Sequence, residues 1–84
     1  MTLHDLFVEY NTTSLNVLIN IFGNRIDWYT EMLYDFPWDT VAQSNLDHTK
    51  KVLGRLVEIR SFLSEAGVDW DIDANCVFAK LLEI

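Results

Sequence analysis

The residues best suited to chemistry are three aspartates near the end of the chain, Asp69, Asp71 and Asp73. Carboxylates at alternate positions open the calcium-binding loops that join two helices, where they supply the first ligands. The later positions do not fit, because Ala74 stands where the loop needs Gly for a sharp turn and Lys80 stands where it needs a bidentate Glu. We therefore interpret the aspartates as charges at the N-terminus of a last helix, where the helix dipole favours them.

The other residues that could bind a metal or attack a substrate are His4, His48 and Cys76. None of them stands at the C-x-x-C or H-x-x-x-H spacing that builds a zinc site locally. A single Cys beside Val77 in an apolar helical pattern is typical of a core residue, with a Cys–His pair assembled by the fold as the alternative. We expect no catalytic residue, no metal and no cofactor, and a protein that is not an enzyme.

A binding surface is indicated by three acidic residues that recur every four positions between residues 27 and 35, with two Trp and one Tyr beside them. Such residues share one face of a helix, where like charges repel by about 0.2 to 0.5 kcal/mol per pair. Carboxylates steer the approach of a basic partner and aromatic rings supply anchoring area, whereas a solvated helix face is the alternative interpretation. The residues predicted to bind a partner are Asp27, Trp28, Glu31, Tyr34, Asp35 and Trp38.

The composition is that of one small, acidic, folded domain. Half of the 84 residues are hydrophobic and 13% are aromatic, and 13 acidic against 6 basic residues give a net charge of −7. Binding to nucleic acid requires a clustered Lys/Arg surface, and the one segment that could serve as a DNA-recognition helix, residues 14–22, contains neither Lys nor Arg. We expect a single domain over residues 1–84 that does not bind nucleic acid.

The cellular location is predicted from what the chain contains. One cysteine allows no internal disulfide and fits a reducing compartment. The first five residues lack the positive charge of a signal peptide, and the longest apolar stretch, residues 15–22, is far short of the roughly 20 residues that span a bilayer. We expect a cytoplasmic protein without direct membrane insertion.

Capping residues and helical spacing predict an all-α bundle of about five helices. Thr2 caps the first helix, and Thr12 or Thr13 begins a second that Gly23 ends. A third helix starts at Asn24 and runs toward the proline at position 37, which restricts the residue before it.

The second half of the chain is dominated by one long helical pattern. Asp39 caps this segment and Gly67 ends it. Ser44 and Asp47 form a second possible capping pair, so the segment is either one long helix or a short helix followed by a long one. Residues 68–73 alternate apolar and acidic side chains, so they are either extended or coil, and a last helix covers residues 74–81.

The charges are unevenly distributed along the chain. Residues 1–49 carry seven acids against Arg25, whereas residues 50–60 carry four basic side chains against Glu58. A polarised surface of this kind favours self-association, head to tail or about a two-fold axis, so a homodimer is the open alternative to a monomer.

Three segments of the first half of the chain have a counterpart in a known family: Met1-Thr2-Leu3, residues 11–22, and the aromatic residues Trp28-Tyr29 and Phe36-Pro37-Trp38. In these segments the chain resembles the rapid-lysis-inhibition proteins of T-even phages, which are cytosolic accessory antiholins. The resemblance implies that the chain binds the cytosolic N-terminal part of the phage holin and helps a second antiholin to delay lysis. The resemblance assigns no functional role to any residue of this sequence.

We therefore expect a non-enzymatic regulator that occupies a surface on another protein, with the cytosolic segment of a holin as the specific partner. The alternative is an acidic inhibitor or nucleic-acid mimic that blocks a host nuclease, polymerase or defence complex. In that case the acids between residues 27 and 35 would match a phosphate-binding cleft.

Overall fold

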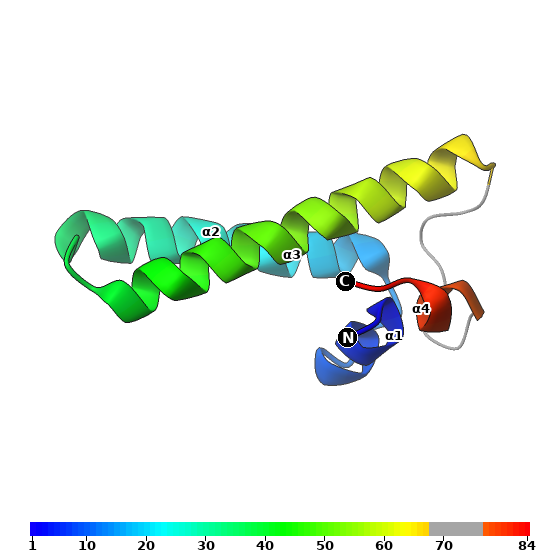
Figure 1. The fold of residues 1–84 in the computed structure, drawn as a ribbon, viewed down its shortest axis with the longest axis horizontal. Helices are drawn as coiled ribbons and strands as arrows, with labels where there is room; N and C mark the ends of the chain where they lie inside the picture. The colour runs from blue at the N-terminus through cyan, green and yellow to red at the C-terminus, as the bar shows by residue number, and fades with distance from the viewer. Residues whose placement is uncertain (68–76) are drawn as a thin grey trace.

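The computed structural model describes residues 1–67 and 77–84, which form four helices (Figure 1). The all-α prediction is confirmed for these residues, but their helix count is four and not about five. The expected extended or coil segment at residues 68–73 and the start of the last helix lie outside the described residues. The helices are α1 (Leu3–Glu9), α2 (Leu15–Asp35), α3 (Thr40–Glu65) and α4 (Val77–Leu81).

The start of α1 follows the expected cap. The Asp5 amide donates to the Thr2 hydroxyl at 3.3 Å, and the Thr2 amide donates to the Asp5 carboxylate at 2.9 Å, which completes a reciprocal capping box. After α1 the chain turns at Asn11, whose φ of 50° lies in the left-handed region that Asn tolerates. This turn directs the chain into α2.

Helix α2 corrects two expectations. It begins after Ser14, whose hydroxyl accepts a hydrogen bond from a backbone amide at 3.3 Å, and not at Thr12 or Thr13. Gly23 does not end a helix, because α2 runs through it for 21 residues, so the second and third expected helices are one. A glycine inside a helix costs about 1 kcal/mol relative to Ala, and tertiary packing of an apolar helix face outweighs a penalty of that size.

The expected N-terminal cap of α3 is confirmed, and the segment that follows it is one helix and not two. The Asp39 carboxylate accepts hydrogen bonds from the amides of Val41 at 3.1 Å and Ala42 at 3.0 Å. The helix then continues through Ser44 as a single helix of 26 residues. It ends before Gly67, whose φ of 74° requires the left-handed conformation that glycine adopts most readily.

The two long helices form an antiparallel hairpin, and α1 and α4 lie together on one side of it near its open end (Figure 1). The chain ends pair there, because the Leu3 amide donates to the Leu82 carbonyl at 2.8 Å and the Ile84 amide donates to the Met1 carbonyl at 2.9 Å. The principal core is confined to this base of the hairpin. Its buried members are Leu3, Leu6, Phe7, Leu15, Leu18, Phe22, Val52, Leu56, Ile59, Leu63 and Ala79.

Candidate partner-binding surface

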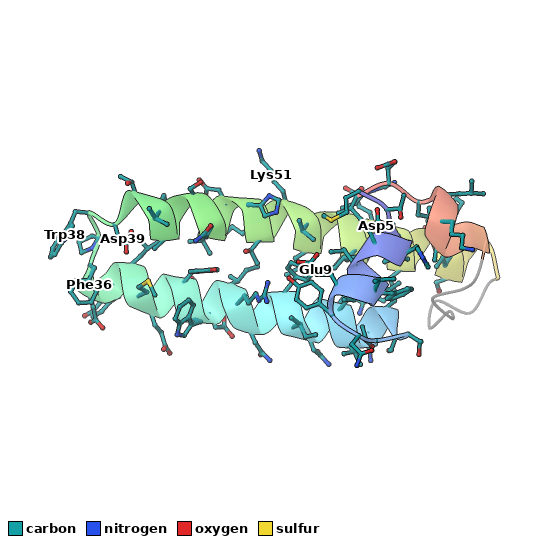
Figure 2. All side chains as sticks on the ribbon, turned by 90° about the horizontal axis from the view of Figure 1, so that it is seen from below. Asp5, Glu9, Phe36, Trp38, Asp39 and Lys51 are labelled. Carbon is teal, nitrogen blue, oxygen red and sulfur yellow. The ribbon has the colours of Figure 1, made fainter. Side chains whose placement is uncertain are left out.

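The hairpin extends beyond its core as a projection of two helices, which we call the arm and define as residues 26–48. The arm begins past Phe22 and Val52, the last members of the core cluster toward the closed end of the hairpin. Figure 1 shows that only α2 and α3 continue to this end, and Figure 2 places Phe36, Trp38 and Asp39 at its tip. Side chains of the arm that point away from the contact between α2 and α3 therefore have few neighbours within the described residues.

Large apolar side chains of the arm are exposed to solvent. Tyr34 is 88% exposed, Trp38 is 74% exposed and Trp28 is 56% exposed, and Phe36 and Val41 are exposed as well. Single exposed apolar residues are ordinary on a protein surface, whereas a contiguous apolar patch is typical of interaction sites.

Aromatic rings of the arm contact one another in two pairs, in which Tyr29 is half-buried and the other three rings are exposed. Trp28 and Tyr29 have ring centroids 5.0 Å apart, and Phe36 and Trp38 form an edge-to-face pair with centroids 5.9 Å apart. Each pairing restrains two side chains, so less conformational entropy remains to be lost when a partner covers them.

The acidic side chains of the arm fall into two kinds. Asp39 is structural, because its carboxylate caps α3. Asp27, Glu31 and Asp35 are exposed, and within the described residues no hydrogen bond or ion pair engages their carboxylates. The one basic residue of α2, Arg25, is directed elsewhere: its guanidinium donates to the Tyr10 hydroxyl and lies 4.8 Å from the centre of that ring.

All six residues predicted from the sequence to bind a partner lie on the arm, five on α2 and Trp38 in the loop after it. The acids follow the outward side of α2, with Trp28 and Tyr34 on either flank of them. The sequence analysis did not include Tyr29, Phe36 and Val41 in this surface. A signal for Phe36 was present, because Pro37 restricts the residue before it and so predicted that the helix ends there.

One basic residue of α3, Arg55, has a structural role. Arg55 donates from Nε to the Glu83 carbonyl at 2.8 Å and lies 3.4 Å from the Glu58 carboxylate, so it ties the C-terminus to the hairpin. Lys50 and Lys51 are exposed, and Lys51 projects away from the hairpin in Figure 2.

Other residues that could do chemistry are not gathered into a site within residues 1–67 and 77–84. No group of three or more His, Cys, Asp or Glu side chains there could hold a metal ion. A crevice between α1 and the long helices includes Glu9, Arg25 and His48, but Arg25 is already bound to a hydroxyl. Cys76 and the aspartates at positions 69, 71 and 73 lie outside the described residues.

Comparison with protein-family models, with curated proteins and with solved structures finds no match for this chain. None of the helices in the described part of the chain has both the length and the apolar character needed to cross a bilayer.

Proposed function

We propose that this protein is a non-enzymatic regulator that binds another protein through the arm. The observation that supports the proposal is the combination of exposed aromatic side chains with unpaired carboxylates on a projecting hairpin. A side chain such as Trp or Tyr buries about 150 to 250 Å² when covered, so a few of them supply most of the anchoring area of an interface.

The expected partner is a segment that carries both basic and apolar residues. The carboxylates of Asp27, Glu31 and Asp35 steer a positively charged segment toward the arm, and Trp28 and Trp38 then contact its apolar side chains. Charge alone would serve a mimic of nucleic acid, whereas the exposed rings between and beside the acids favour a protein partner.

Within this class we propose lysis control, with the cytosolic N-terminal segment of a phage holin as the partner. This assignment rests on the resemblance of residues 1–3, 11–22 and 28–38 to the rapid-lysis-inhibition proteins. Binding would hold the holin in a form that delays lysis, and it requires no chemical step from this chain.

The test measures binding of a synthetic peptide that corresponds to the cytosolic segment of a T-even phage holin, by titration calorimetry. We expect the triple variant Asp27→Asn, Glu31→Gln, Asp35→Asn to weaken binding at least tenfold, and Trp38→Ala to weaken it similarly. The matched control replaces three exposed acids outside the arm, Glu9, Glu58 and Glu65, by Gln and should bind as the unaltered protein does.

Three results would count against the proposal. A holin segment that does not bind at all would remove the assignment to lysis control. Equal weakening by the arm variant and the control variant would show that net charge, and not the arm, governs binding. Displacement of the bound peptide by excess duplex DNA would instead favour an acidic inhibitor that shares a site with nucleic acid.

A further inference from the structure

A crevice with polar walls lies where the arm joins the base of the hairpin. Its volume is about 240 Å³, and it is lined from three helices, α1, α2 and α3. The lining residues of each long helix are spaced three or four apart, so each helix contributes one face. The polar ones that the argument uses are Glu9, Tyr10, Arg25, Tyr29, Asn45 and His48. Figure 2 shows Glu9 on the side of α1 that faces the arm.

The floor of this crevice is apolar. Leu6, Phe22 and Val52 line it, all three are at most 5% exposed, and all belong to the core cluster. A floor of this kind accepts the apolar part of a ligand, while the polar groups around it fix the ligand's orientation. The volume is below the roughly 300 to 1,000 Å³ of pockets for drug-sized molecules, so the ligand that fits is a smaller one.

Arg25 is held in place on one wall. Its guanidinium donates to the Tyr10 hydroxyl and lies 4.8 Å from the centre of the Tyr10 ring and 5.6 Å from that of Phe22. The two rings pack edge to face, which restrains them in turn. The hydroxyl engages one of the five N–H donors of the guanidinium, so the others remain for a ligand. A planar guanidinium that is already restrained binds a carboxylate through two parallel hydrogen bonds at little further cost in entropy.

Glu9 brings the opposite charge into the same crevice without pairing with Arg25. Within the described residues no hydrogen bond or ion pair engages the Glu9 carboxylate, which is exposed. The two side chains therefore leave room for a ligand that carries both charges. An α-amino acid carries a carboxylate and an ammonium group on one carbon atom, whereas a phosphate or a dicarboxylate would bring a like charge next to Glu9.

The remaining polar side chains offer hydrogen bonds to such a ligand. The Asn45 amide, the His48 imidazole and the Tyr29 hydroxyl line the crevice, and no hydrogen bond within the described residues engages them. The Thr49 hydroxyl is already used, because it donates to the Asn45 carbonyl at 2.7 Å. Donors and acceptors on both long helices are thus available around one small volume.

We propose that this crevice binds a free α-amino acid with a small aliphatic side chain, such as L-leucine. Arg25 binds its carboxylate, Glu9 binds its ammonium group, and the apolar floor contacts its side chain. The proposal goes beyond the proposed function and does not depend on it, because it uses other side chains. Since Glu9 is on α1 and Arg25 is on α2, the bound ligand should also hold α1 against the hairpin and raise the midpoint of thermal unfolding.

The test measures binding of three related probes to the full chain by titration calorimetry. L-Leucine has both charges, L-leucinamide lacks the carboxylate and 4-methylpentanoate lacks the ammonium group. We expect L-leucine to bind with a dissociation constant of about 1 mM or less, and each of the other two to bind about tenfold more weakly or worse. Thermal unfolding should shift upward with L-leucine and much less with the other probes.

Two variants assign each charge to its residue. Arg25→Gln should weaken binding of L-leucine about tenfold and leave that of L-leucinamide within about twofold, because the amide lacks the group that Arg25 binds. Glu9→Gln should weaken L-leucine similarly and leave 4-methylpentanoate unchanged or bound more tightly. The matched controls Lys50→Gln and Glu65→Gln remove the same charges outside the crevice and should bind L-leucine as the unaltered protein does. All four positions are exposed, so the variants should fold, and far-UV circular dichroism checks this.

Three results would overturn the proposal. The first is no binding of L-leucine at concentrations up to about 10 mM, well above the expected dissociation constant. The second is equal binding of all three probes, because the two charges would then play no part. The third is equal weakening by the crevice variants and their controls, which would place any bound amino acid elsewhere on the protein.

Discussion

Two aspartates of the arm, Asp35 and Asp39, have opposite effects on the stability of the helices beside them. Asp35 lies in the last turn of α2, where the helix dipole disfavours a negative side chain, and no described contact compensates for it. Asp39 lies four residues later and accepts two amide hydrogen bonds at the start of α3. The first carboxylate therefore has a cost to folding that a binding role would explain, and the second has a role in folding itself.

This difference predicts opposite effects of two neighbouring substitutions. Asp39→Ala removes the cap of α3 and should lower the free energy of unfolding by about 1 kcal/mol, within a range of about 0.5 to 2. Asp35→Ala should leave it unchanged or raise it by about 0.3 to 1 kcal/mol, because an unfavourable charge is removed. Urea denaturation of the two variants measures both effects, and a loss of stability in Asp35→Ala comparable to that in Asp39→Ala would contradict this account.

The capping box of α1 predicts a pH dependence. The Thr2 amide donates to the Asp5 carboxylate, and this hydrogen bond, with a smaller contribution from the Thr2 hydroxyl, holds the pKa of Asp5 below its ordinary value of 3.8. A carboxyl whose pKa is lowered by folding contributes stability above pH 3.8, and that contribution disappears as the pH falls through the lower pKa of the folded state.

The variant Asp5→Asn tests that dependence. It should be less stable than the unaltered protein at neutral pH, and the difference should shrink toward zero well below pH 3.8. Urea denaturation at the two pH values measures it. The control is Glu9→Gln, an exposed acid of the same helix without a described partner, and a pH dependence shared by both variants would refute the role of the cap.

At the scale of helices, local signals in the sequence predicted the caps but not the continuity of α2. Thr2, Asp39 and Gly67 act where they were expected, because capping depends on a few adjacent backbone groups. Gly23 was misread as a helix end, since its local preference is overridden by packing against α3, which no local signal reports. The acids and rings of the arm could be found from spacing, because residues three and four apart share a helix face, whereas the exposure of that face could not, because it depends on which side of the hairpin α1 and α4 cover.

The two helical glycines provide a test at this scale. Gly54 lies in α3 and points outward, and like Gly23 it has open space where a Cβ would be added. Gly54→Ala should raise the free energy of unfolding by about 0.5 to 1 kcal/mol through helix propensity alone. Gly23→Ala should raise it by a similar amount, because neither site has a neighbouring atom that the added methyl group would meet. Urea denaturation of both variants measures these gains, and a loss of stability in either variant would contradict this account.

At the scale of the whole molecule, the structure separates the arm from the packed base of the hairpin. The arm is acidic and aromatic and projects from the core, whereas the buried apolar side chains gather where α1 and α4 meet α2 and α3. Association driven by exposed charges is screened by salt, with a screening length of about 10 Å at 0.1 M, whereas burial of apolar area is little affected at moderate ionic strength. Binding at the arm and the stability of the fold should therefore respond differently when salt is added.

The association rate with a basic partner peptide should fall about tenfold between about 0.02 and 0.5 M NaCl, since the carboxylates of the arm steer the encounter. The free energy of unfolding should change much less over the same range, because the core that holds the fold together is apolar. Stopped-flow fluorescence of the arm tryptophans follows the first quantity and urea denaturation follows the second. An association rate that does not change with salt would mean that the carboxylates of the arm do not steer the encounter.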